Sequence, residues 1–181
     1  MRQSLESSLA LLARTPVSLD TLLRGLPDAW TLHSEGKGTW SARDVIAHLA
    51  ELERTDWMPR VRRLLEFGET RAFDPVDRQA FVRNARGKSL ARLLGEFARL
   101  REKNLREVKA LRLRRRDFAR GGVHPSLGSV TLSELVAAWA VHDLTHVHQI
   151  TRILAFQYRD AVGPWDRYLG VLQCNGHSAA A

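Results

Sequence analysis

Apolar side chains recur every three or four positions along most of this chain, which is the spacing of amphipathic helices. The first such stretch covers residues 3–14, and Pro16 is expected to interrupt it before a further turn or two. A second helix is predicted from Ser41 to about residue 58, because the aspartate three positions after this serine fits a variant of the capping box. Pro59 is expected to kink this helix, since an apolar stripe continues beyond it.

The second half of the chain carries two longer helical patterns. One begins near Ser89 and places leucine and phenylalanine on one face as far as Leu105. The other opens at Thr131, whose glutamate three residues later completes a capping box, and continues toward Gly163. Between these two helices the glycines and proline of residues 121–125 break the helical pattern.

Four main helices with one long middle connection indicate an all-α protein, a four-helix bundle. A chain of 181 residues is long enough for one domain with a proper core and short for two. No internal repeat and no low-complexity linker divides the sequence. Residues 1–181 are therefore predicted to form a single domain.

The composition limits the class of protein. An apolar fraction of 44% argues against disorder, and the single cysteine, Cys174, rules out an internal disulfide and is typical of a reducing compartment. No apolar run approaches the ~20 residues needed to span a bilayer, and the N-terminal segment lacks the apolar core of a signal peptide. We therefore expect a cytoplasmic protein with no membrane partner.

The formal net charge of +8 raises the question of nucleic-acid binding. The basic residues are nearly all arginines scattered over several segments, and the densest run lies within residues 112–116. A solvated helix end or loop explains such a run more often than a phosphate-binding patch does. No helix-turn-helix, zinc-finger or RNA-binding motif accompanies the charge, so nucleic acid is an unlikely partner.

Three histidines fall on the apolar faces of predicted helices. His142 and His146 are four residues apart, which places their Cβ atoms ~5–6 Å apart on one face, whereas His148 lies off that face. His48 shares an apolar stripe of the second helix. Burying three imidazoles without partners would cost roughly a few kcal/mol each. One shared metal ion would satisfy all three and leave coordination positions open for water or substrate.

Simpler and competing interpretations remain open. A single histidine on an apolar face is usually a hydrogen-bonded core residue. The glutamate of an HExxH metalloprotease and the Glu-x-x-His pairs of a di-iron bundle are absent. Glu51, three residues after His48, and His124, in the glycine-bearing loop, are candidate catalytic bases. Asp143 is rotated by about 100° from His142 and is interpreted as a structural hydrogen-bond partner.

Two segments resemble the signatures of a known family. Residues 39–49, followed by Glu51 and Glu53, are similar to the first signature of the DinB-like superfamily. That superfamily groups the DinB, YfiT and mycothiol- or bacillithiol-dependent transferase proteins. The second signature is similar to His124-Pro125, Gly128, Thr131-Leu132, Glu134, His142-Asp143, His146 and Gln149-Ile150. The likeness spans roughly residues 5–172, almost the whole chain.

The resemblance implies a fold, a site and a reaction. The fold would be a bundle with up-down-down-up connectivity and a long crossover connection. The site would hold a divalent metal, commonly zinc or nickel, on His48, His142 and His146. The reaction would be transfer of a low-molecular-weight thiol onto a small electrophile, with a metal-dependent hydrolase or a non-catalytic metal-binding stress protein as alternatives. Relatives often pair, so a homodimer is also expected.

Overall fold

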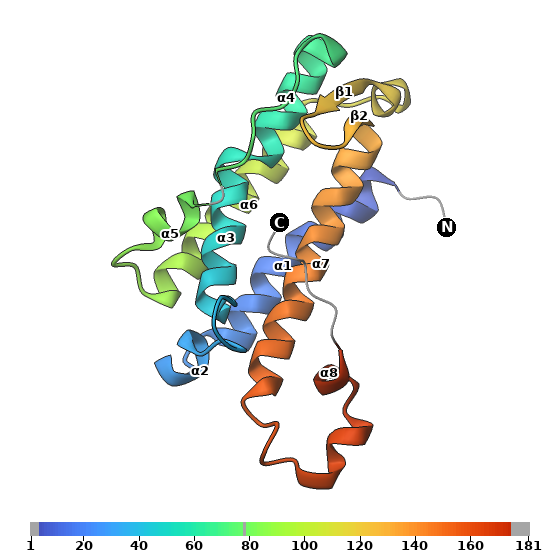
Figure 1. Ribbon diagram of the computed structural model, residues 1–181. Coiled ribbons are helices and arrows are strands. Elements are labelled where there is room, and N and C mark those ends of the chain that lie inside the picture. Colours follow the sequence, from blue (N-terminus) through green and yellow to red (C-terminus); the bar gives the residue numbers. More distant parts are fainter. Residues whose placement is uncertain (1–3, 78, 175–181) are drawn as a thin grey trace.

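Four long helical segments pack side by side in the computed structural model, which describes residues 4–77 and 79–174 (Figure 1). These segments are α1 (Leu5–Leu23), α3 (Ala42–Thr55) continued by α4 (Trp57–Phe67), α6 (Leu90–Ala110) and α7 (Leu132–Phe156). Shorter helices are α2 (Asp28–Leu32), α5 (Ala80–Ala85), α8 (Gly170–Gln173) and the 3-10 helices η1 (Gly68–Thr70), η2 (Arg115–Ala119) and η3 (Gly163–Tyr168). The predicted four-helix bundle is confirmed.

The contacts between helices give their directions. Arg54 pairs with Glu96, and farther along both helices Arg62 pairs with Glu107, so α3–α4 and α6 run parallel. Apolar contacts join the beginning of α1 to the beginning of α7 and the end of α1 to the end of α7, so these two helices are parallel as well. Both descend in Figure 1 while α3, α4 and α6 ascend. The connectivity is therefore up-down-down-up, with the segment from α4 through α5 to α6 as the crossover.

The bundle has two apolar clusters, one toward each end. The cluster nearer the start of α7 includes Leu12, Met58 and Trp139, and the other includes Phe97 and Ile150. Each long helix changes from one cluster to the other near its middle, where buried polar side chains replace apolar ones. The bundle therefore contains a polar level between two apolar ones, and both signature segments pass through it.

Pro16 does not interrupt the first helix, so that prediction is wrong. The helix α1 continues through it from Leu5 to Leu23. Because proline has no backbone N–H, the carbonyl of Leu12 one turn earlier lacks its helical donor. Arg101 of α6 donates from Nη1 to this carbonyl oxygen over 2.8 Å. A guanidinium from a neighbouring helix thus replaces the missing backbone hydrogen bond.

The kink expected at Pro59 lies earlier in the chain, at Asp56, where α3 ends and α4 begins. Asp56 has φ −114° and ψ −68°, which departs from regular helical values. Pro59 then falls within the first turn of α4, where backbone N–H groups have no acceptor inside the helix. The proline therefore belongs to the start of a new helix.

The helical break predicted at residues 121–125 is a two-stranded antiparallel hairpin of β1 (Gly121–His124) and β2 (Gly128–Thr131). A Cβ added at Gly122 would approach the Leu64 side chain to 3.1 Å, so glycine permits the close packing of this hairpin on α4. The helix α7 ends at Phe156, earlier than predicted, and the chain continues in turns to η3. Within residues 4–77 and 79–174, every helix is too short or too polar to cross a lipid bilayer.

Candidate metal centre

The three histidines selected from the sequence come together in the middle of the bundle. His142 Nε2 lies 3.3 Å from His48 Nε2 and 3.1 Å from His146 Nε2. One ring nitrogen from each residue lies within 4.8 Å of the others. A tetrahedral ion bound at ~2.0–2.1 Å holds its ligand nitrogens about 3.3 Å apart. The two separations from His142 match this spacing, and the third pair lies within 4.8 Å, so the three nitrogens lie close enough together to hold one ion.

The helices orient these rings in a simple way. His142 and His146 are one turn apart on α7, and His48 faces them from the antiparallel helix α3. The Nδ1 atom of His146 lies 2.7 Å from Oε1 of Gln149, an atom that only accepts hydrogen bonds. His146 Nδ1 therefore carries the proton, and its Nε2 presents a lone pair to the other two histidines. The spacing of His146 and Gln149 was visible in the sequence, but the orienting role was not predicted.

Aromatic rings surround the three imidazoles. Trp40 lies 4.8 Å from the His48 ring, and its plane is stacked at 14° against the His146 ring at 6.2 Å. Phe81 of the crossover meets the His48 ring edge-on at 5.7 Å. The Trp57 ring lies 5.2 Å from the His142 ring. These contacts exclude water from much of the imidazole surface.

Burial keeps the three imidazoles neutral. Burial, with a smaller contribution from the neighbouring His146, lowers the pKa of His48 from 6.5 to about 3. It lowers the pKa of His142 to about 2, together with His146, His48 and the Arg101 guanidinium. The pKa of His146 is also lowered by burial, against the opposing effects of Gln149 and Asp143. Neutral imidazoles whose ring nitrogens converge suit a cation, so the donor set fits a divalent metal.

The lowered histidine pKa values predict how the stability of the metal-free protein changes with pH. Unfolding returns the pKa of each imidazole to near 6.5, so below that pH the unfolded chain binds more protons than the folded chain. Stability should therefore fall as the pH drops from 6.5 toward about 3, by about 1.4 kcal/mol per pH unit for each of His48 and His142. Urea unfolding of EDTA-treated protein at several pH values measures this slope. His48→Phe should reduce this slope by about 1.4 kcal/mol per pH unit, which is the contribution of one proton. An unchanged slope in that variant would contradict the lowered pKa of His48.

A buried polar layer lies next to the histidines and consists of Glu53, Arg101, Asn104 and Asp143. Arg101 Nη1 donates to Asp143 Oδ2 at 2.5 Å, and its Nη2 donates to Asp143 Oδ1 at 2.9 Å and to Glu53 Oε1 at 2.8 Å. Asn104 Nδ2 donates to Glu53 Oε2 at 2.9 Å. Asp143 is thus a structural hydrogen-bond partner, as the sequence indicated. The other three residues were not predicted to be buried.

Neither candidate base joins the three histidines. The Glu51 carboxylate is buried and held by Arg54 and by Asn84 of α5. His124 lies in the hairpin, where its Nδ1 accepts two backbone N–H groups. At 1.5 Å per residue, its end of α7 is about 15 Å along the helix from His142. The catalytic roles of Glu51 and His124 stay predictions.

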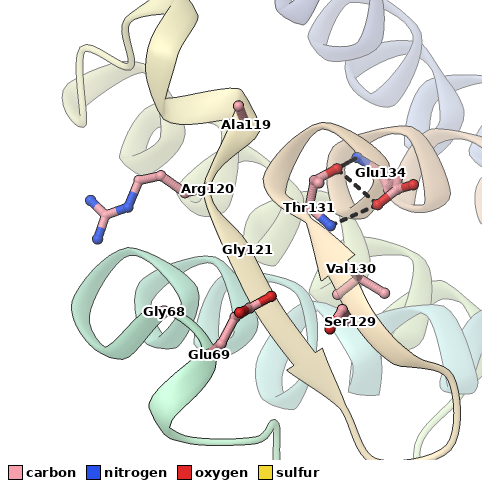
Figure 2. Close-up of a pocket in the computed structure, with 9 residues that line it drawn as sticks. All are labelled: Gly68, Glu69, Ala119, Arg120, Gly121, Ser129, Val130, Thr131 and Glu134. Atoms are coloured by element: carbon pink, nitrogen blue, oxygen red, sulfur yellow. Dashed lines mark hydrogen bonds between the residues drawn. The ribbon is translucent and has the colours of Figure 1, made fainter.

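A cavity of about 640 Å³ lies at the hairpin end of the bundle and not at the histidines. Figure 2 shows Glu69 beside Gly121 at this cavity, with Thr131 and Glu134 joined in the capping box and Arg120 extending away from it. The remaining lining residues are Gly68, Ala119, Ser129 and Val130. The Glu134 carboxylate accepts hydrogen bonds from the backbone N–H and the hydroxyl of Thr131 at the start of α7. None of the residues that line this cavity belongs to the candidate metal centre.

With the fold and the three convergent histidines described, the chain can be compared with known proteins. The chain belongs to the DinB superfamily, whose model matches residues 11–150. YfiT from Bacillus subtilis, described as a probable metal-dependent hydrolase with an unusual four-helix bundle topology, is similar in structure. Its TM-score is 0.71 at 21% identity, over 94% of this chain and 93% of that one.

A second solved structure, the four-helix bundle protein TT2238, has a TM-score of 0.57 at 21% identity. The match covers 82% of this chain and 98% of that one. No curated protein matches the chain in sequence. At these identities the likeness to solved structures shows the fold, and the family follows from the superfamily match.

Proposed function

We propose that this chain is a divalent-metal-dependent enzyme that transfers a low-molecular-weight thiol onto a small electrophile. The observation that carries the proposal is the convergence of three neutral imidazoles, with Nε2 separations of 3.1 and 3.3 Å. Zinc and nickel are the proposed ions, because imidazole ligands suit both. The resemblance of the two signature segments to the thiol-dependent transferases supports the choice of reaction.

The residues of the site have distinct tasks in this reaction. An ion held by three neutral imidazoles keeps its full charge and open positions, so it would stabilise a bound thiolate. Gln149 fixes the tautomer of His146, and Trp40 and Phe81 shield His48 from water. His48 and His142 are partly exposed, so we propose that a small-molecule substrate reaches the ion past these two side chains.

Metal-dependent hydrolysis is the second candidate, because YfiT is described as a probable metal-dependent hydrolase. A zinc ion on three imidazoles lowers the pKa of a bound water to about 7, so a hydrolase would not depend on Glu51, which is engaged by Arg54 and Asn84. A free thiol, with a pKa of ~8.5, also ionises readily on such an ion. The choice of a thiol as the nucleophile therefore rests on the resemblance of the two signature segments to the thiol-dependent transferases.

The proposal is tested on protein purified without an affinity tag. We expect near-stoichiometric zinc or nickel, together with conjugation of monochlorobimane to cysteine, glutathione, bacillithiol or mycothiol above the uncatalysed rate. EDTA treatment should abolish the conjugation and added metal should restore it. Metal-dependent hydrolysis of p-nitrophenyl acetate without thiol consumption would support the hydrolase instead. Bound metal without either reaction would favour a non-catalytic metal-binding protein, and failure to bind metal would overturn the proposal.

The expected homodimer and cytoplasmic location stay predictions. Nucleic acid remains an unlikely partner, because many of the arginines that produce the net charge are held in ion pairs within the chain. Examples are Arg54, Arg62, Arg63, Arg101 and Arg152.

A further inference from the structure

The buried polar layer carries a net negative charge. Every oxygen of the Glu53 and Asp143 carboxylates accepts a hydrogen bond, and the donors are Arg101 Nη1 and Nη2, Trp139 Nε1 and Asn104 Nδ2. Each of these partner atoms can only donate. A protonated carboxyl group would need an acceptor for its own proton, and these contacts offer none. Both carboxylates are therefore anions, and one guanidinium balances only one of them.

This excess charge lies beside the three histidines. Asp143 directly follows His142 in α7. The side chains of Arg101, Glu53 and Asp143 are at most 2% exposed, so solvent screens their charges weakly. Trp139 connects the two groups, because its Nε1 donates to Glu53 and its ring stacks on Trp57, which contacts His142.

An uncompensated buried anion is destabilising unless a cation lies close to it. The three imidazoles are neutral and cannot supply that positive charge, whereas a divalent ion between them can. We propose that Glu53, Arg101 and Asp143 are positioning residues that set the charge of the metal centre, and that their net charge of −1 raises its affinity for a divalent cation. This inference rests on the metal site of the proposed function and adds the charges that tune it.

The inference is tested by neutralising one carboxylate without removing a histidine. Asp143→Asn should weaken binding of Zn²⁺ and Co²⁺ by ~10–100-fold, the range found when groups that support metal ligands are removed. Competition with a chromophoric chelator measures the dissociation constant. The visible spectrum of the Co²⁺ form should keep the band positions of the wild type, because all three nitrogen ligands remain. Asp74→Asn is the matched control, since that carboxylate is 77% exposed and pairs with Arg63 at the surface, and its affinity should be unchanged.

A second variant tests whether a change in metal affinity comes from the lost charge or from a disturbed fold. Glu53→Gln neutralises the other carboxylate on a different helix and should weaken metal binding in the same range, with a wild-type Co²⁺ spectrum. Wild-type affinity in either folded variant would overturn the inference while leaving the three-histidine site intact. Failure of both variants to fold, even with saturating metal, would show that the layer serves the fold alone and would also overturn it. If the wild type binds no metal, the proposed function fails first, so the two failures are distinguishable.

Discussion

Protein carrying His146→Ala is expected to lose nearly all of its bound metal. This residue is one of three converging histidines proposed as ligands, and the one whose Nδ1 contacts Gln149. If the ~10–16 kcal/mol of a four-ligand zinc site is shared among its ligands, losing one weakens binding by about 2.5–4 kcal/mol, roughly 70- to 850-fold. Elemental analysis of tag-free protein after gel filtration, followed by competition titration with Zn²⁺, measures the effect.

His148→Ala is the control for this substitution, because His148 lies on the same helix but is not part of the converging group. It should retain metal at the wild-type level. Full metal content in the His146 variant would contradict the assignment and leave the three histidines as polar core residues. Equal loss in both variants would point to a general disturbance of α7.

Arg101→Met is expected to destabilise the fold by about 3–5 kcal/mol, because it leaves two buried carboxylates without their guanidinium. The substitution also removes the donor to the Leu12 carbonyl. Methionine retains an unbranched apolar side chain, so the loss reflects charge and hydrogen bonding more than lost volume. Urea unfolding of the metal-free protein at neutral pH, monitored by helical circular dichroism, measures the change in the free energy of unfolding.

Arg106→Met provides the matched control on the same helix. Arg106 pairs with Glu102, and the two side chains are 68% and 67% exposed. Surface pairs of this kind contribute roughly 0–1 kcal/mol. If the Arg101 and Arg106 variants were equally stable, the buried ion pair would add little to the fold.

The sequence predicted the bundle and the three histidines because both follow a periodic pattern. The stripes of α3 and α7 place His48, His142 and His146 on interior faces, and the antiparallel arrangement of these helices brings them together. Helix starts were also predictable, since the capping boxes at Ser41 and Thr131 are formed as expected. Local spacing is sufficient information for these features.

The buried polar layer was not predicted, because charged residues are normally read as solvated. Glu53 follows Glu51 closely, and Arg101 lies among other charged residues of α6. One signal was present: Arg101 continues the apolar face of α6 between Phe97 and Leu105. Its partners, however, come from three other helices, and no spacing within one helix reveals such a contact.

The proline in α1 connects this helix to the buried polar layer. Pro16 leaves the Leu12 carbonyl without a helical donor. Arg101 donates a hydrogen bond to this carbonyl oxygen and also to the carboxylates of Glu53 and Asp143. The backbone of α1 is thereby a member of the same hydrogen-bond network that lies against the histidines. Separation of α1 from the bundle would break this network, so we expect local opening near Pro16 to disturb the candidate metal centre as well. The first helix, which contributes none of the three histidines, is thus linked to them through Arg101.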